Sequence, residues 1–443
     1  MSMERNNNLK QKLLFHDCWS RIRHASLKGD ILFNNLLCHF NVENFKEAFD
    51  SQDGKKAVGI DGITKKIYEK NLEANVTELT RKIHVGSYKP RSKKEVLIPK
   101  ANGKTRPIAI SCFEDKLVEW IIGKILESIY DQTFIRNSFG FRRNKSVDNA
   151  IKAVYCSLKN NKRPNVVEID FTSFFNTIAH RKLMKILGKK ISDNRFKGLI
   201  GRFLMVGILE QSGIEKLSET GTPQGSIMSP ILANIYLDEV LDKWFIEKYG
   251  SYNNIIVRYA DDAVFFFKKK EVAEHFVIDL FNRIEKYGLS LNKDKTKTIN
   301  FGKDENTSFD FLGFTFYWAK KFNCIKKILK LKTKKETLIK KINEFYKWIK
   351  ESRNKMKTKV LLEKTKEKLI GHYNYYGYFI NIRKLYHYYF EVIKSLFKWL
   401  NRRSQKKSFG REKFKKILFY NNIPKPPILS KLKRLDRSGI VLC

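Results

Sequence analysis

Two adjacent aspartates, Asp261 and Asp262, stand between the apolar stretches 255–259 and 263–267. The β-branched and aromatic residues of both stretches predict two strands joined by a tight turn that carries the acids. Because neighbouring carboxylates repel each other and Mg²⁺ prefers oxygen ligands, a divalent cation is the natural partner of this pair. A plain hairpin with a solvated acidic turn is the alternative, and it is the better choice for such a pair in isolation.

A third aspartate, Asp170, follows another strand-like run, residues 166–169, and precedes the aromatic residues Phe171 and Phe175. By itself it would be an ordinary strand-end cap. If the three acids meet at neighbouring strand ends, they can hold two Mg²⁺ ions about 3.5–4 Å apart. Such ions activate an attacking 3′-hydroxyl and stabilise a leaving pyrophosphate, so the predicted chemistry is nucleotidyl transfer.

Two further segments could hold a nucleotide. Residues 221–230 form a Gly-, Pro- and Ser-rich loop before a predicted helix, which can approach a nucleotide closely, although a plain helix-entry turn fits as well. Lys100 and Arg106 flank the pair Asn102 and Gly103, the signal of a β-hairpin. These cations could grip a triphosphate, Arg106 by its fork and Lys100 as a point charge, unless the hairpin is simply solvated.

The composition predicts a globular protein with a polyanionic partner. Of 443 residues, 42% are hydrophobic and 13% aromatic, which indicates two or three packed units and excludes wholesale disorder. Lysine and arginine number 88 against 46 acids, a net charge of +42, which favours nucleic acid over a basic membrane-surface role. The sequence has no 18-residue apolar run and no secretory signal, so we expect no membrane partner. The six cysteines lack a CxxC pair and indicate neither a zinc site nor a disulfide framework.

The positive charge is concentrated in the last part of the chain. Residues 320–443 carry 36 lysines and arginines against 8 acids, whereas residues 1–319 carry 52 against 38, so we place a boundary near residue 320. Before it, the strand-like runs and the helical spacing over 146–158 and 228–244 predict an α+β unit. After it, apolar residues recur at three and four positions, which predicts an all-α basic appendage. Its expected helices are 325–351, 360–379 and 385–401.

In their order and spacing these segments resemble the reverse transcriptases and, within them, the group II intron-encoded reverse transcriptase/maturases. The segments that carry the resemblance are residues 100–107, 137–142, 170–175, 222–230, 259–262, 288–296 and 311–314. The resemblance implies an α+β right-hand polymerase with fingers, palm and thumb, followed by an all-α basic thumb/maturase region. The implied domains are an N-terminal extension and fingers (1–165), a catalytic palm (166–319), a helical thumb/maturase region (320–400) and a basic maturase tail (401–443).

The resemblance also implies roles for single residues. Asp170 and Asp261 would bind two Mg²⁺ ions, or Mn²⁺ in their place, with Asp262 in the same charge cluster. Phe175, five positions after Asp170, would exclude a ribose 2′-hydroxyl, so dNTPs are the expected substrates; a core aromatic is the alternative. Lys295 would protonate the pyrophosphate. The residues implied in binding the incoming dNTP are Lys100, Arg106, Phe171, Phe175, Gln224 and Lys295.

A further set of residues would contact nucleic acid. Gly313 lies in the segment expected to cradle the primer terminus. The maturase-like segments 371–379 and 399–409 would bind RNA through phosphate contacts and aromatic stacking, although tyrosines packed between helices and a solvated basic face fit too. The implied contacts are Arg142, Gly313, Tyr375, Arg402, Arg403, Lys406 and Lys407.

The implied function is RNA-directed DNA synthesis coupled to binding of a structured group II intron RNA for splicing and mobility. The partners would be that RNA, an RNA template, a DNA primer and dNTPs, with no membrane and with a homodimer allowed, in the bacterial cytoplasm or an organelle matrix. Only 34 residues follow Phe409, and they contain no His/Asn/Cys cluster of a nuclease, so we expect the type that lacks the endonuclease. Two rival hypotheses are a domesticated relative in phage defence or DNA repair, and an RNA-binding splicing cofactor.

Overall fold

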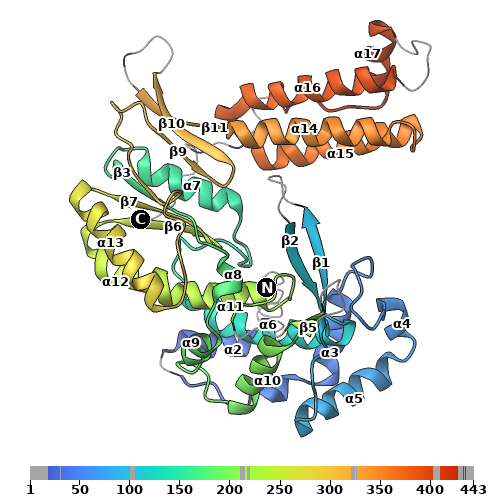
Figure 1. The fold of residues 1–443 in the computed structure, drawn as a ribbon, viewed down its shortest axis with the longest axis vertical. Coiled ribbons are helices and arrows are strands. Elements are labelled where there is room, and N and C mark those ends of the chain that lie inside the picture. The colour runs from blue at the N-terminus through green and yellow to red at the C-terminus, as the bar shows by residue number, and fades with distance from the viewer. Residues whose placement is uncertain are drawn as a thin grey trace, which may run out of the picture. The chain divides into compact units, whose positions relative to one another are not determined.

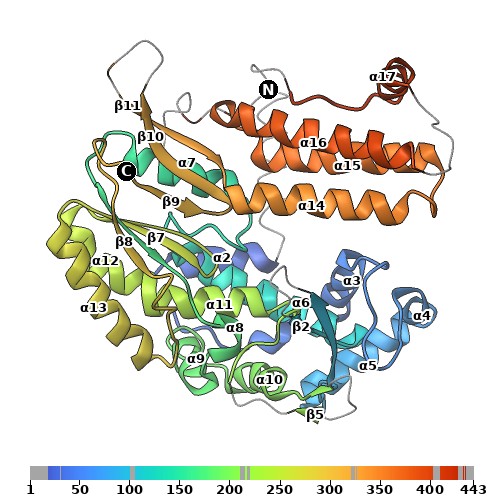
Figure 2. The ribbon, with the colours of Figure 1, turned by 45° about the horizontal axis from the view of Figure 1, so that its top comes forward.

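The computed structural model describes residues 18–29, 31–99, 105–209, 215–216, 220–320, 325, 327–402, 410–427, 433 and 435. Four residues predicted to bind ligands, Lys100, Arg403, Lys406 and Lys407, lie outside these ranges. The chain divides into two compact units, Met1–Ala150 with Val167–Thr298 and Ile151–Val166 with Ile299–Cys443 (Figures 1 and 2). This division by compactness does not coincide with the predicted domain boundaries, which stay predictions. Within the described ranges, no helix is both long enough and apolar enough to cross a membrane.

The first unit combines helices with most of two four-stranded sheets, one of which has two strands that run across the division between the units. Its helices are α2 (Cys18–Leu27), α3 (Val42–Ser51), α4 (Lys65–Glu69), α5 (Leu72–Val85), α6 (Phe113–Tyr130), α8 (Phe174–Thr177), α9 (His180–Leu187), α10 (Asn194–Met205), α11 (Ser229–Leu237), α12 (Lys243–Tyr249) and α13 (Lys270–Lys286). Short 3₁₀ turns are η1 (Leu36–His39), η2 (Asp131–Thr133) and η4 (Gly250–Tyr252), η3 (Asp238–Asp242) is π-helical, and α7 (Val147–Leu158) crosses the division between the units.

One sheet has the strand order β2-β1-β4-β5 and the other β6-β7-β3-β8. Their strands are β1 (Lys93–Pro99), β2 (Thr105–Ile110), β3 (Asn165–Ile169), β4 (Ile208–Leu209), β5 (Glu215–Lys216), β6 (Ile255–Tyr259), β7 (Asp262–Phe267) and β8 (Lys297–Asn300). β1 and β2 pair antiparallel, which confirms the hairpin predicted around Asn102 and Gly103. β3, β6 and β7 likewise confirm the three predicted strands, and the succession α11, η3 and α12 confirms the helix predicted over 228–244.

The second unit contains a three-stranded sheet of order β11-β10-β9 and a layer of helices (Figure 1). Its elements are β9 (Ser308–Phe311), β10 (Phe314–Lys320), β11 (Lys327–Thr333), α14 (Lys335–Ser352), α15 (Thr358–Tyr376), η5 (Phe379–Asn381), α16 (Ile382–Leu400) and α17 (Arg411–Tyr420). The helix predicted over 325–351 was wrong in its first part, because β11 occupies Lys327–Thr333. There Leu329, Leu331 and Thr333 are buried at alternate positions, which is the period of a strand paired with β10.

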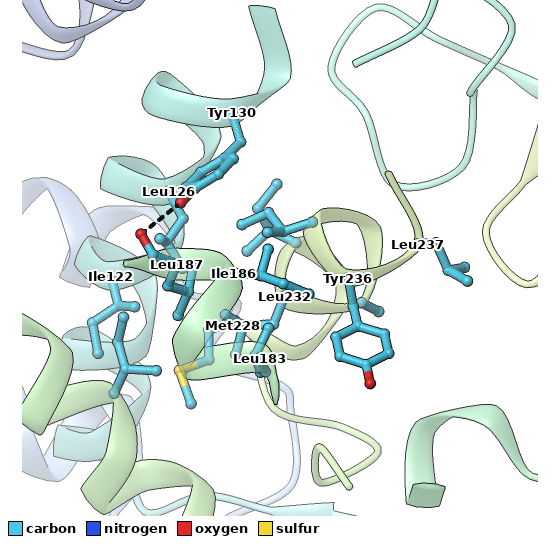
Figure 3. Close-up of a cluster of buried hydrophobic side chains, with 14 of the residues drawn as sticks. Ile122, Leu126, Tyr130, Leu183, Ile186, Leu187, Met228, Leu232, Tyr236 and Leu237 are labelled. Atoms are coloured by element: carbon cyan, nitrogen blue, oxygen red, sulfur yellow. Dashed lines mark hydrogen bonds between the residues drawn. The ribbon is translucent and has the colours of Figure 1, made fainter. Parts of the chain in front are cut away.

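A hydrophobic cluster in the first unit anchors the helix that follows the Gly-, Pro- and Ser-rich loop. Figure 3 shows side chains of α6, α9 and α11 meeting there, among them Ile122, Leu183 and Leu232, all fully buried. The buried Tyr130 donates its hydroxyl to the carbonyl of Leu187 at 3.1 Å, so its polar end is satisfied. Each buried Leu or Ile contributes roughly 1.5–3 kcal/mol. The cluster therefore fixes the start of α11, and with it the end of the loop.

Candidate active site

The turn between β6 and β7, residues 259–262, presents the two adjacent aspartates; we call it the aspartate turn. Tyr259 pairs with Asp262, so Ala260 and Asp261 form a two-residue hairpin loop. Ala260 has a φ of 56°, a left-handed conformation that is unfavourable for a residue with a side chain. Such a conformation persists only where the surroundings enforce it.

The segment around Gly140 encloses the aspartate turn from one side. A Cβ atom at Gly140 would lie 2.2 Å from the backbone nitrogen of Ala260, so only glycine permits this approach. The backbone nitrogen of Phe139 donates to the carbonyl of Arg258, and that of Arg258 donates to the carbonyl of Asn137, each at 2.9 Å. The sequence segment 137–142 is therefore a backbone support of the aspartates.

A buried ion pair supports the turn from inside. Arg258 and Asp242 are both fully buried, and the guanidinium reaches the carboxylate through Nε at 2.8 Å and Nη2 at 2.5 Å. Arg258 Nη1 also donates to the carbonyl of Ala260 at 3.0 Å and to Asn234 Oδ1 at 2.9 Å. Asn234 in turn donates to the carbonyl of Gly140 at 2.7 Å. This network connects four parts of the chain: the π-helical η3, helix α11, the segment around Gly140 and the aspartate turn.

Asp170 directly follows β3, and its backbone is held by residues 290–292, an extended segment that follows α13. The backbone nitrogen of Asn292 donates to the carbonyl of Asp170 at 2.8 Å, and that of Thr172 donates to Ser290 at 2.9 Å. Lys295 Nζ lies 3.0 Å from Asp170 Oδ2. Because this ion pair is largely exposed, it is worth at most about 1 kcal/mol and a stronger cation can displace Lys295.

The electrostatics of the site couple the three carboxylates. Loss of hydration raises the pKa of Asp261, and the charge of Asp170 raises it further, while Arg106 and Arg258 oppose the shift. Asp262 is exposed at the rim, but the atoms packed around it still reduce its hydration. That loss, followed by the charges of Asp261 and Asp170, raises the pKa of Asp262 to about 6 against the opposing charge of Lys295. The three acids are thus close enough to oppose each other's ionisation.

The donor set fits a divalent cation, although the ligands are not gathered into a metal cluster. Among the residues that the structure describes, no three His, Cys, Asp or Glu side chains are placed so as to hold an ion together. The carboxylate oxygens are the hard ligands that Mg²⁺ prefers, and the ammonium of Lys295 already stands as a cation on Asp170. A bound cation would relieve the repulsion that raises the pKa of Asp262.

The pH dependence of metal binding follows from the pKa of Asp262. Because that raised pKa keeps a proton on Asp262 up to about pH 6, Mg²⁺ must compete with the proton at lower pH. We expect the Mg²⁺ concentration that half-saturates the site to be about tenfold higher at pH 5 than at pH 7, since one proton competes. Titration of Mg²⁺ at both pH values measures this. Equal half-saturating concentrations would show that Asp262 does not lie next to the metal.

The loop that carries Gln224 is tied to the β1–β2 hairpin. Arg106 Nε donates to Gln224 Oε1 at 2.7 Å, and the backbone nitrogen of Ala109 donates to the carbonyl of Gln224 at 2.6 Å. Gly225 has a φ of +112°, and a Cβ atom there would lie 2.6 Å from the carbonyl of Ala109. Two predicted nucleotide-binding residues, Arg106 and Gln224, are therefore brought together.

A second buried ion pair supports this loop. Lys93 Nζ lies 2.6 Å from Glu119 Oε1, and both side chains are almost fully buried. Glu119 Oε2 also accepts the backbone N–H of Ile227 at 2.8 Å, which fixes the loop just before α11. A pocket of about 290 Å³ adjoins the loop, lined by residues that include Asn176, Thr222 and Gln224.

Phe175 and Phe171 occupy different environments. Phe175 is half-buried on α8, and its carbonyl accepts the backbone N–H of Thr222 at 2.7 Å, so it lies against the loop that carries Gln224. Phe171 is buried, and its ring packs 5.3 Å from that of Phe174. Part of Phe175 is exposed, although its ring also packs 5.4 Å from that of Phe174, whereas Phe171 contributes to the core. The nucleotide-binding roles of both residues stay predictions.

Among the residues predicted to contact nucleic acid, Arg142 uses its guanidinium for contacts within the protein. Its guanidinium pairs with Asp131 at 2.6 Å and donates to the carbonyls of Asp131, Ile135 and Ser138 at 2.9 Å. These contacts give Arg142 a structural role, because they stabilise the segment 137–142 that supports the aspartate turn. Its predicted contact with nucleic acid stays a prediction.

In the second unit, Gly313 and Tyr375 meet at one hairpin. Leu312 and Gly313 both have positive φ, 49° and 77°, and turn the chain between β9 and β10. Tyr375 donates its hydroxyl to the carbonyl of Leu312 at 3.1 Å and stacks on Phe314, and a Cβ atom at Gly313 would lie 3.1 Å from the hydroxyl of Tyr376. Arg402 is exposed just after α16.

Comparison with known proteins adds the family. Residues 98–316 match the family model described as reverse transcriptase (RNA-dependent DNA polymerase). Protein YkfC of Escherichia coli is 31% identical over 297 residues, which cover 59% of this chain and 76% of that protein. The chain belongs to the reverse transcriptase family. This match confirms the predicted family, the right-hand polymerase fold class and RNA-directed DNA polymerase activity. Reverse transcriptases use divalent metal ions, in agreement with the donor set of the aspartates.

Two other relatives of this reverse transcriptase are connected with introns by name. The group II intron-encoded protein LtrA of Lactococcus lactis is 34% identical over 201 residues, 45% of this chain and 33% of that protein. An uncharacterised 91 kDa protein in the cob intron of Schizosaccharomyces pombe is 42% identical over 158 residues, 36% of this chain and 19% of that protein. The chain thus matches a third or less of the length of these two intron relatives.

The residues that sequence reasoning missed are those that hold the site. Arg258, Asp242 and Asn234 do not bind a substrate, but they fix the aspartate turn, and Glu119 fixes the loop with Gln224. The available signal was a charge inside an otherwise apolar strand, Arg258 in β6, because such a charge requires a buried partner.

Proposed function

We propose that this reverse transcriptase copies RNA into DNA at Asp170, Asp261 and Asp262 by two-metal nucleotidyl transfer, and that it binds a group II intron RNA to assist splicing and mobility. The observation that carries the proposal is the enforced aspartate turn beside Asp170, whose charge raises the pKa of both Asp261 and Asp262. This arrangement lies inside the segment that matches the family model.

The residues of the site have distinct parts in this proposal. Bound Mg²⁺ ions would lower the pKa of the attacking 3′-hydroxyl and neutralise the leaving pyrophosphate. Asp170, Asp261 and Asp262 would hold those ions, with the two adjacent carboxylates presented by the aspartate turn. Arg106 binds the triphosphate while Gln224, to which it donates a hydrogen bond, contacts the nucleotide. Lys295 holds a proton beside Asp170, where the pyrophosphate leaves.

The intron RNA is proposed from two observations. The relative LtrA is named as a group II intron-encoded protein. Residues 320–443 carry 36 basic against 8 acidic residues, an excess that suits the phosphates of a folded RNA.

The direct test is extension of a DNA primer on an RNA template by the full chain with Mg²⁺ and dNTPs. We expect RNA-templated DNA synthesis, and faster splicing of a group II intron RNA when the protein is added. Failure of wild-type protein to extend the primer, with splicing still accelerated, would favour the splicing cofactor. Primer extension without any effect on splicing would favour the rival hypothesis of a domesticated reverse transcriptase that no longer acts on an intron.

Substitution of Phe175 by alanine tests the gate against ribonucleotides. The backbone of Phe175 is bonded to the loop of Gln224, and we expect its partly exposed side chain to clash with a ribose 2′-hydroxyl. Phe175→Ala should therefore incorporate rNTPs at least about tenfold better relative to dNTPs, a change of about 1.4 kcal/mol. Single-nucleotide incorporation with each substrate measures the ratio. Phe174→Ala is the matched control, because its ring is buried, packs against those of Phe171 and Phe175, and has no proposed role in binding. An unchanged ratio of rNTP to dNTP incorporation in Phe175→Ala would show that Phe175 is a core residue that does not discriminate between the two substrates.

A further inference from the structure

Four cations of the second unit surround one tryptophan where α14 and α16 end. The charged groups of Lys350, Arg353, Lys398 and Arg402 lie 5.9, 4.5, 5.5 and 5.5 Å from the centre of the Trp399 ring. We call these four side chains the Trp399 cluster. Helices α14 and α16 are in contact, since the ring of Tyr346 packs against that of Trp399, so residues about 50 positions apart in sequence meet there (Figure 1).

The positive charge of the Trp399 cluster is not neutralised within the protein. None of the four cations forms an ion pair with any residue that the structure describes, although neighbouring lysines on the same helices do, such as Lys347 with Glu351 and Lys394 with Glu391. All four charged groups lie within 5.9 Å of one ring centre, so physiological salt screens their mutual repulsion only in part. The cluster therefore repels itself.

Two local interactions account for only part of this arrangement. An aromatic face attracts cations, but the indole of Trp399 has only two faces, so this attraction cannot balance the repulsion among four cations. The C-termini of two helices each supply the equivalent of roughly half a negative charge, about one in total against four positive charges. The remaining positive charge calls for an external anion.

Hydrogen-bond donors in the cluster also lack acceptors. The buried Nε of Arg353 and the buried indole nitrogen of Trp399 have no hydrogen-bond partner within the described part of the chain. The hydroxyl of Tyr346 accepts from Lys398 Nζ at 3.0 Å. That hydrogen bond lowers the pKa of Tyr346, and Lys350 and Arg402 lower it further, as a locally positive field requires. Those two nitrogens are buried and out of reach of an external ligand, whereas the exposed Lys350, Lys398 and Arg402 present N–H donors that match phosphate oxygens.

We propose that the Trp399 cluster is a binding site for the phosphodiester backbone of a structured RNA. Trp399 itself is buried and serves as the scaffold on which the cations stand, so the site contacts phosphates and not bases. The choice of RNA as the source of the phosphates rests on the proposed function. The site adds Lys350, Arg353 and Lys398, on two helices, to Arg402, which the sequence analysis had already indicated.

The test compares two double variants of the full chain with the same change in net charge. Lys350→Gln with Arg402→Gln removes two cations of the cluster. Lys347→Gln with Lys394→Gln removes two exposed lysines of the same helices that already have acidic partners. Binding of a fluorescent hairpin RNA and of a DNA duplex of the same stem sequence is measured by anisotropy from about 0.05 to 0.5 M salt.

We expect the cluster variant to bind the hairpin RNA on the order of 50-fold more weakly near 0.1 M salt. The slope of log K against log salt should become shallower by about 2, since roughly 0.9 counterions are released per phosphate neutralised. The control variant should keep the slope of the wild type. Equal losses in both variants would overturn the site, because only the diffuse charge would then matter, and a loss restricted to the DNA duplex would overturn the assignment to RNA.

Thermal unfolding and primer extension of the same proteins keep the outcomes separate. Wild-type protein that extends a primer and binds the hairpin RNA, with a cluster variant that binds equally well, contradicts the site alone. Wild-type protein that neither extends a primer nor accelerates splicing contradicts the proposed function, whereas the anisotropy result still decides the site. An unchanged unfolding temperature in the cluster variant excludes misfolding as the cause of weak binding.

Discussion

Asp261→Asn is expected to abolish RNA-templated DNA synthesis while leaving the fold intact. The substitution removes a proposed metal ligand from the aspartate turn, and a loss in kcat of about 10³-fold or more corresponds to about 4 kcal/mol of transition-state stabilisation. Folding should not suffer. Because the pKa of Asp261 is raised, its ionised form is disfavoured in the folded protein, so a neutral side chain at pH 7 should leave the unfolding temperature equal or slightly higher.

The matched control is Asp294→Asn, which neutralises an exposed acid next to Lys295 that has no proposed role as a ligand. Primer extension, RNA binding and thermal unfolding are measured for both variants. Asp294→Asn should extend the primer at close to the wild-type rate. Wild-type synthesis by Asp261→Asn would remove Asp261 from the metal site and with it the proposed mechanism.

Asp242→Ala is expected to have the largest effect on stability. It leaves the guanidinium of Arg258 buried without its carboxylate, and breaking a buried ion pair in this way costs about 3–5 kcal/mol. The same change frees the group that holds the carbonyl of Ala260, so primer extension should fall as well. Lys248→Ala, which breaks the partly exposed pair with Asp279, is the control and should cost less than about 1 kcal/mol.

A double variant separates stability from positioning. Asp242→Leu with Arg258→Met replaces the buried pair by apolar side chains, which is often neutral or stabilising, so most of the free energy of unfolding should return. Extension should stay at least about 100-fold below wild type, a loss of about 2.7 kcal/mol, because no side-chain donor then holds the carbonyl of Ala260. Urea unfolding and single-turnover extension measure the two quantities. Full activity in this stable double variant would reduce Arg258 to a purely structural residue.

The parts of the fold that sequence could predict are those specified locally. The apolar runs on both sides of the aspartates gave β6 and β7, and the Asn-Gly pair gave the β1–β2 hairpin, since adjacent residues decide these elements. β11 was misassigned as helix because Lys327, Lys330 and Lys332 left too few apolar residues in this stretch to separate a period of two from one of 3.6.

The parts that could not be predicted depend on residues far apart in sequence. Nothing near Arg258 specifies that its partner is Asp242 on a π-helical turn, or that Gly140 must approach Ala260. The Trp399 cluster likewise joins two helices that are separated in the chain by the whole of α15. Local pattern identifies the chemistry of single residues, whereas the contacts that hold them are set by tertiary packing.

The left-handed Ala260 has a consequence for engineering. Glycine is the residue that prefers this backbone geometry, so selection for heat resistance will tend to find Ala260→Gly, which relaxes the hairpin. The relaxed enzyme would survive higher temperatures, yet its acidic pair would sample more orientations. At the methyl group of Ala260, thermal stability and catalytic rate therefore place opposite demands on the enzyme.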